Sequence, residues 1–199
     1  MFNFENMLQG FSTGMRRCML MLLFLTVDAR ATNRSNSSPC QAAVHEFLSL
    51  PSQRTLTALT RADETGCWAV IESSNRKLNR LNRWAEHGNR WAAQYSARHL
   101  KQLDGGNLED TLIALGQFSD HDMERLLLFA KQGLLSKGEL SDALTMLPLT
   151  LSDRPSAQLA VLKARRSKVV RLTRADLRQQ RIQALSAIDE FDSEIKLKR

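Results

Sequence analysis

Residues that start helices and residues that end them follow one another along most of the chain, and they constrain its fold more than any other feature. Ser136 and Glu139, for example, have the spacing of a capping box, and Pro148 ends the helix that they open. No segment keeps the alternation of apolar and polar residues that a half-buried strand requires. The start and end signals predict helices at 39–50, 52–66, 68–87 (one or two helices), 89–103, 107–117, 119–133, 136–147, 155–170 and from 173 onward.

The last of these helices carries the clearest apolar stripe. Its members recur at the 3.6-residue period: Leu177, Ala184, Leu185, Ile188, Phe191 and Ile195. The connections between helices are short, which places neighbouring helices antiparallel. We therefore predict an all-α fold, an array or bundle of seven to nine short antiparallel helices with a solenoid as one form, in a single helical domain at 39–199.

An apolar segment near the N-terminus has the three parts of a secretory signal peptide. Met15-Arg16-Arg17 precedes ten uncharged residues, and Ala29-Arg30-Ala31 supplies a small-x-small cleavage site. Ten residues span about 15 Å as a helix, half the hydrocarbon thickness of a membrane, which argues against a transmembrane helix. We predict a signal peptide at 1–31, with Met15 as an alternative start, a flexible polar linker at 32–38 and a periplasmic or secreted protein. A buried N-terminal helix is the other interpretation.

The cysteines agree with export. Cys18 leaves with the signal peptide, and Cys40 and Cys67 remain as an even pair. In an oxidising compartment, two cysteines that can meet normally form a disulfide. One helix running out for about 15 Å and a second returning for about 18 Å bring the two together. We predict a Cys40–Cys67 disulfide; two reduced, buried cysteines in a cytosolic protein are the alternative.

One stretch resembles a known repeat family. The segment from Trp84 to Tyr95 reads WAEHGNRWAAQY and resembles the Ala-Glu-x-Gly-Asn-x-x-Ala-Gln-Tyr start of a Sel-type repeat, a relative of the tetratricopeptide repeat, with one extra residue. The segment DGGNLED that follows resembles that repeat's turn into its second helix, with Thr111 where Ala is expected. The resemblance covers 84–118, with no second copy at a fixed spacing. It implies a helical-hairpin scaffold that binds other proteins, and it argues against an enzyme.

Motifs for chemistry are scarce. His45-Glu46 begins like a zinc-protease helix, but Ser49 stands where the second His is needed. Asp120-His121-Asp122 could supply two carboxylates and an imidazole to a metal. They are adjacent at a predicted helix start, however, where the helix macrodipole explains acidic residues. Glu72 follows an apolar run as the general acid does in lytic transglycosylases, but the downstream segment of that family is missing. We predict no metal, no cofactor and no catalytic residue, with Glu72 as the one candidate general acid.

All three tryptophans and the only tyrosine fall within 68–95. Trp91 and Tyr95 are four residues apart and share a helix face, and Trp84 precedes Trp91 by seven residues. Aromatic and Arg side chains contribute much of the binding energy of protein interfaces. Trp84, Trp91 and Tyr95 are therefore candidate partner-binding residues, with packing in the core as the alternative. Five arginines rim the cluster: Arg76, Arg80, Arg83, Arg90 and Arg98.

The formal net charge is +7, and the densest positive run lies between 163 and 181. It contains a single acid, Asp176. Arg165, Arg166, Lys168 and Arg171 are candidate contacts for an acidic protein or an anionic envelope surface. A solvated helix face is the alternative. Nucleic acid would be considered for a cytosolic protein, and export argues against it. The run consists of Lys163, Arg165, Arg166, Lys168, Arg171, Arg174, Arg178 and Arg181.

Together these observations predict an exported helical protein of the cell envelope that binds another macromolecule and is no enzyme. One specific form is an immunity or inhibitor protein that occludes a toxin or hydrolase; an adaptor is another. The alternatives are an envelope hydrolase acting on peptidoglycan through Glu72, and a secreted effector.

Overall fold

The computed structural model describes residues 38–63 and 66–197. The predicted signal peptide at 1–31, and the 32–38 linker except for Ser38, lie outside these residues. The helices described below all belong to one unit, Pro39–Arg199. None of the helices in the described residues is long and apolar enough to cross a membrane.

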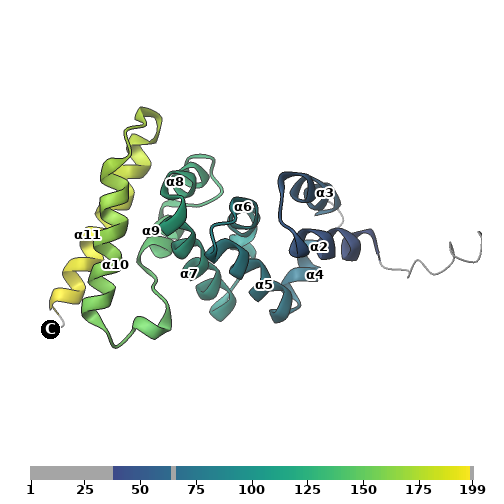
Figure 1. Cartoon of the computed structure of the whole chain (residues 1–199), viewed down its shortest axis with the longest axis horizontal. Coiled ribbons are helices and arrows are strands. Elements are labelled where there is room, and N and C mark those ends of the chain that lie inside the picture. The colour runs from purple at the N-terminus through teal and green to yellow at the C-terminus, as the bar shows by residue number, and fades with distance from the viewer. Residues whose placement is uncertain (1–37, 64–65, 198–199) are drawn as a thin grey trace, which may run out of the picture. The chain divides into compact units, whose positions relative to one another are not determined.

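The described residues form ten α-helices, three short 3-10 helices and no strand. The predicted all-α array is confirmed, with more helices than the seven to nine expected. Figure 1 shows the helices in order along the chain. Their bounds are α2 Pro39–Ser49, α3 Gln53–Asp63, α4 Trp68–Glu72, α5 Asn75–Glu86, α6 Arg90–His99, η2 Leu100–Gln102, α7 Gly105–His121, α8 Met123–Lys131, α9 Lys137–Thr145, η3 Leu149–Leu151, α10 Pro155–Arg171, η4 Ala175–Leu177 and α11 Arg178–Leu197.

The 68–87 stretch is two helices, one of the two forms predicted, because Ser73 ends α4 and Ser74 takes an extended conformation at the start of α5. The bounds of α7 and α8 differ from the prediction, and α7 already begins at Gly105 instead of at 107. The α7 helix continues through Ser119 to His121, and the next helix starts later than predicted because Asp122 is its N-cap, accepting a hydrogen bond from the backbone N–H of Arg125 at 2.9 Å. The capping box of Ser136 and Glu139 is present at the start of α9.

The core lies between helices that pack in chain order. The α5 helix packs on α6 and α7, α7 packs on α8 and α9, and α11 covers α9 and α10. Leu78, Leu81 and Ala85 line the buried side of α5. Asn82, also on that side, donates from Nδ2 to Thr111 Oγ1 of α7 at 3.2 Å, which satisfies a polar group that would otherwise be buried unpaired.

The turn between α5 and α6 fixes the position of α2 as well. Gly88 takes a positive φ of 83°, the left-handed conformation that glycine adopts after a helix, and its N–H and that of Asn89 close the last turn of α5. Asn89 then caps α6 by accepting from two backbone N–H groups. Its Nδ2 donates to the carbonyl of Pro51, in the α2–α3 connection, at 3.1 Å. One side chain therefore joins two turns of the array.

The predicted Cys40–Cys67 disulfide is present, with Cα atoms 5.0 Å apart. It links the first turn of α2 to the residue before α4. Both cysteines are buried and belong to the apolar core. Helix α2 therefore runs out from Cys40 and α3 returns toward Cys67, as the helix lengths predicted.

Candidate functional site

The three aromatic residues predicted to bind a partner are in different surroundings. Tyr95 is 0% exposed, so its predicted role on a contact surface is wrong, and it belongs to the core instead. Trp84 is half-buried and donates from Nε1 to the carbonyl of Leu48 at 2.9 Å. Trp91 is half-buried under the guanidinium of Arg90, whose Cζ lies 4.3 Å from the ring centre. Of the three, Trp84 and Trp91 keep part of their surface accessible.

Tyr95 serves to hold the end of α3 against α6. Its hydroxyl donates to Asp63 Oδ1 at 2.8 Å, and His99 Nε2 lies 3.1 Å from Asp63 Oδ2. The ring of His99 stacks on Trp68 with centroids 4.5 Å apart. Burial, and then the negative charge of Asp63, raise the pKa of Tyr95 far above its usual value, so the phenol stays protonated. Sequence reasoning missed His99, although its position four residues after Tyr95 places both on one face of α6.

Most cations of the basic run at 163–181 contact acids or backbone carbonyls of the same chain. Arg165 is 1% exposed, so its predicted contact with a partner is wrong. Its Nε and Nη2 each lie 3.3 Å from a carboxylate oxygen of Asp120 on α7, and Nη1 donates to the carbonyl of Leu144 on α9 at 2.8 Å. Gly116 makes room for it, since a Cβ there would lie 2.3 Å from the carbonyl of Ala143 and 3.1 Å from Arg165. Arg165 therefore joins α10 to α7 and α9.

Neighbouring cations of the run also bind acids or backbone of the same chain. Lys168 donates to the backbone carbonyl of Asp120 and lies 3.8 Å from its carboxylate. Arg166 donates to Asp189 on α11 at 2.7 Å, and this hydrogen bond raises the pKa of the guanidinium. Arg171 is exposed and donates from Nε to a backbone carbonyl of its own helix. The charges of Arg166 and Lys168 are thus partly neutralised by acids of the same chain and are less available to a partner.

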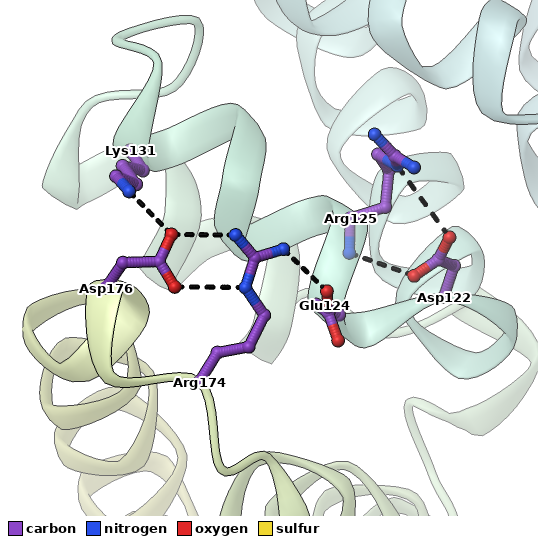
Figure 2. Close-up of polar contacts among 6 residues, drawn as sticks. All are labelled: Asp122, Glu124, Arg125, Lys131, Arg174 and Asp176. Atoms are coloured by element: carbon purple, nitrogen blue, oxygen red, sulfur yellow. Dashed lines mark hydrogen bonds and ion pairs between the residues drawn. The ribbon is translucent and has the colours of Figure 1, made fainter.

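A further network joins η4 to α8, as Figure 2 shows. Arg174 lies between two acids, with Nη1 2.8 Å from Glu124 and Nη2 2.7 Å from Asp176. Lys131 reaches the same carboxylate of Asp176 at 2.7 Å. The hydrogen bonds from Arg174, and then Lys131, lower the pKa of Asp176 far below its usual value. The acids come from outside the basic run except Asp176, which explains why the run looked unpaired in the sequence.

The exposed side of α5 is different. Arg76, Arg80 and Arg83 are exposed and lie at i, i+4 and i+7, which places them along one helix face. None of the three forms an ion pair with a residue that the structure describes. The only acid of α5 is Glu86, in its last position. We call Arg76, Asn79, Arg80, Arg83, Trp84 and His87 the arginine face.

The arginine face is hollowed, and α2 forms one wall. One groove runs between α2 and α5, with the buried side chains of Val44 and Leu48 at its floor and Arg76 and Arg80 at its rim. A second hollow is lined by Arg80, Arg83, Trp84 and His87. A third lies over Arg76, Asn79, Arg80 and Arg83. Arg80 lines all three, so the hollows form one continuous surface.

The remaining candidates for chemistry do not come together. Glu72 is half-buried at the end of the five-residue α4 and lines none of the three hollows of the arginine face. Asp120 binds Arg165, Asp122 caps α8, and His121 lies against Gly88, so these three adjacent residues diverge. Within the described residues, no group of three His, Cys, Asp or Glu side chains could hold a metal ion.

Comparison with known proteins adds no family: no protein-family model, curated protein or solved structure matches the chain. The segment that resembles a Sel-type repeat contains the end of α5, all of α6 and most of α7, and these are helices, but the fold identifies no repeat family. The candidate functional site is the arginine face. Its three arginines were named from the sequence only as part of the rim of an aromatic cluster.

Proposed function

We propose that this chain is an exported, non-enzymatic helical protein that binds a negatively charged macromolecule of the cell envelope on its arginine face. One observation carries the proposal: three arginines lie on one exposed helix face beside a half-buried tryptophan, with no acid of the described residues paired to them. Exposed like charges on one face repel one another, and a partner that supplies negative charge relieves this repulsion.

The disulfide supports the export part of the proposal. Disulfides persist in the periplasm and outside the cell, and they are rare where thiols are kept reduced. An N-terminal segment with the features of a signal peptide precedes it in the sequence. Mass spectrometry of the protein from its native source tests this directly. We expect a chain that begins at Thr32 and lacks the two thiol hydrogens of Cys40 and Cys67; an intact N-terminus with free thiols would contradict export.

An inhibitor or immunity protein is the specific form of this function that fits a small disulfide-bonded helical domain; an adaptor fits it as well. The test uses the oxidised protein immobilised on a support and an extract of the cell envelope. We compare the wild type with Arg76→Gln/Arg80→Gln/Arg83→Gln. The control is Lys163→Gln/Arg171→Gln/Arg178→Gln, which removes the same amount of charge from exposed residues elsewhere.

We expect the wild type and the control to retain the same component and to release it in high salt, because screening weakens contacts between exposed charges. The arginine-face variant loses this component. If both triple variants lose it equally, total charge explains the retention. If the arginine-face variant still retains it, the arginine face is not the binding site. Either result would overturn the proposal.

A further inference from the structure

The three hollows of the arginine face impose a pattern on whatever fills them. Arg76 and Arg83 are seven residues apart, about 10 Å along the axis of α5, and Arg80 lies between them. A guanidinium is a planar group with five N–H donors, and it pairs best with a carboxylate or phosphate that accepts two hydrogen bonds at once. The face therefore suits an elongated ligand that carries several such groups at intervals.

Trp84 adds an apolar requirement. Its single polar atom, Nε1, is already bound to the carbonyl of Leu48, so the part of the ring that remains accessible is carbon. The hollow around it is completed by Arg80, Arg83 and His87. The stems of arginine side chains are aliphatic and cover apolar surface while their charged ends stay in water. The hollow thus accepts an apolar group between two positive charges.

This arrangement favours a protein over a membrane. A helix that binds a membrane surface inserts exposed apolar side chains into the lipid. The described part of α5 has no large apolar side chain exposed, and Trp84 is recessed between arginines, so the partner must bring its own apolar group to the site. An acidic protein segment with an apolar side chain between carboxylates does this.

The segment of this chain before Pro39 is the wrong occupant on charge. Residues 1–37 contain four arginines and two acids, Glu5 and Asp28. A segment with a net positive charge gains nothing from three arginines. The negative charge that complements the arginine face must therefore come from another molecule.

Building on the proposed function, we propose that the partner is an acidic protein, and that it binds through a segment that lies along α5. In this complex Asp or Glu side chains of the segment pair with Arg76, Arg80 and Arg83, and an aromatic or aliphatic side chain between them rests on Trp84. Binding of such a segment would occlude the carboxylates that it presents, which is how an inhibitor of an acidic toxin or hydrolase would act.

The experiment is a selection of short random peptides displayed on phage against the immobilised, oxidised wild-type protein, with prior removal of peptides that bind the Arg76→Gln/Arg80→Gln/Arg83→Gln variant. We expect the selected peptides to share an aromatic or aliphatic residue flanked by Asp or Glu. Binding of a selected peptide should weaken about tenfold or more in Arg80→Gln, because central arginines are frequent hot spots of interfaces. In Lys163→Gln/Arg171→Gln/Arg178→Gln it should stay within about twofold of the wild type.

Two further measurements separate this inference from the proposed function. The same proteins are tested against vesicles of anionic phospholipid and against single-stranded DNA. Binding to either one that needs the arginine face, without selection of acidic peptides, would overturn the acidic-protein partner and leave an anionic partner in place. Selected peptides that lack acids, or that bind the arginine-face variant equally well, would also overturn the inference. No binding to peptide, vesicle or DNA would overturn the inference alone, because retention of a component of the envelope extract decides the proposed function.

Trp84→Phe tests the apolar contact because it keeps an aromatic ring but removes part of the indole surface, together with the hydrogen bond to Leu48. Circular dichroism first establishes that the variant is folded. We expect the selected peptides to bind Trp84→Phe more weakly while their dependence on salt stays the same, since the arginines remain. Unchanged affinity would show that the apolar residue of the peptide does not contact Trp84.

Discussion

The two ends of the array are both rich in arginine, but they use it in opposite ways. Helices α2 to α6 are held together by a disulfide, by hydrogen bonds from Tyr95 and Asn89 and by apolar packing, and no acid in the described part of the chain pairs with the arginines of α5. Helices α7 to α11 are joined by ion pairs in which Arg165 and Arg174 take part. Dense positive charge in a sequence therefore does not by itself identify a binding surface. The cations are free to bind a partner only where the fold brings no acidic residues to them.

The largest effect is expected from the disulfide, which holds the end with the unpaired arginines. Replacing Cys40 and Cys67 together with Ala should lower the free energy of unfolding by about 3–4 kcal/mol, the entropy of closing this loop in the unfolded chain. Urea unfolding followed by circular dichroism measures it. A reductant should destabilise the wild type similarly and leave the variant unchanged.

The contrast between the two ends of the array would be wrong if the disulfide proved dispensable. A loss well below about 1 kcal/mol would mean that packing and hydrogen bonds alone hold α2 to α4 in place. The arginine face would then depend on the core beneath α5, such as Leu78 and Leu81, and not on the covalent link at the start of α2.

The second prediction compares two arginines directly. Arg165→Met should lower the free energy of unfolding by about 2–3 kcal/mol, because it leaves the carbonyl of Leu144 and part of Asp120 without a partner; Asp120 is partly exposed and keeps Lys168, which limits the loss. Arg80→Met should change it by less than about 0.5 kcal/mol. Equal effects in urea unfolding would show that the arginines of the two regions have the same role.

Much of the backbone could be predicted from local signals. The capping box of Ser136 and Glu139, the cap at Asn89 and the glycine after α5 act within a few residues, so the sequence shows them directly. The disulfide followed from the helix lengths and from the two cysteines that remain after the predicted signal peptide is set aside. The start of α8 was misplaced because Ser119, Asp120 and Asp122 are all good caps by local sequence, and packing selects among them.

The candidate site could not be predicted in the same way. Arg165 and Asp120 are 45 residues apart, and Arg174 and Glu124 are 50 residues apart, so no local pattern reveals that these cations are engaged. The three arginines of α5 looked less prominent than the eight cations of the later run. Their importance follows from two features of the fold: no acid of the described residues pairs with them, and α2 forms a groove beside them.

The third prediction concerns the link between the two turns that place α2 beside α5. Asn89→Ala should lower the free energy of unfolding by about 1–2 kcal/mol through loss of the cap of α6 and of the hydrogen bond to Pro51. Asn89→Asp keeps the cap acceptor and loses only the donor, so about 0.5–1.5 kcal/mol is expected. If both variants cost the same, the cap contributes nothing and the contact to Pro51 explains the whole effect.

The smallest effect is expected from the exposed network of Figure 2, and its sign can be worked out. The pKa of Asp176 is lowered in the folded protein by Arg174 and Lys131, so the carboxylate contributes stability above its unfolded pKa of about 3.9 and loses it as the pH falls toward the folded pKa. The melting temperature of the wild type should therefore exceed that of Asp176→Asn slightly at neutral pH, and the difference should shrink below about pH 3.9.

Salt and a matched variant test the cause. Because the network is exposed, high salt should reduce the same difference at neutral pH. Arg174→Gln should return the NMR titration midpoint of the Asp176 carboxyl toward its ordinary value, whereas Arg80→Gln should leave that midpoint unchanged. A midpoint that is ordinary in the wild type would mean that Arg174 is as free as the arginines of α5, and the contrast between the two ends would then rest on Arg165 and Arg166.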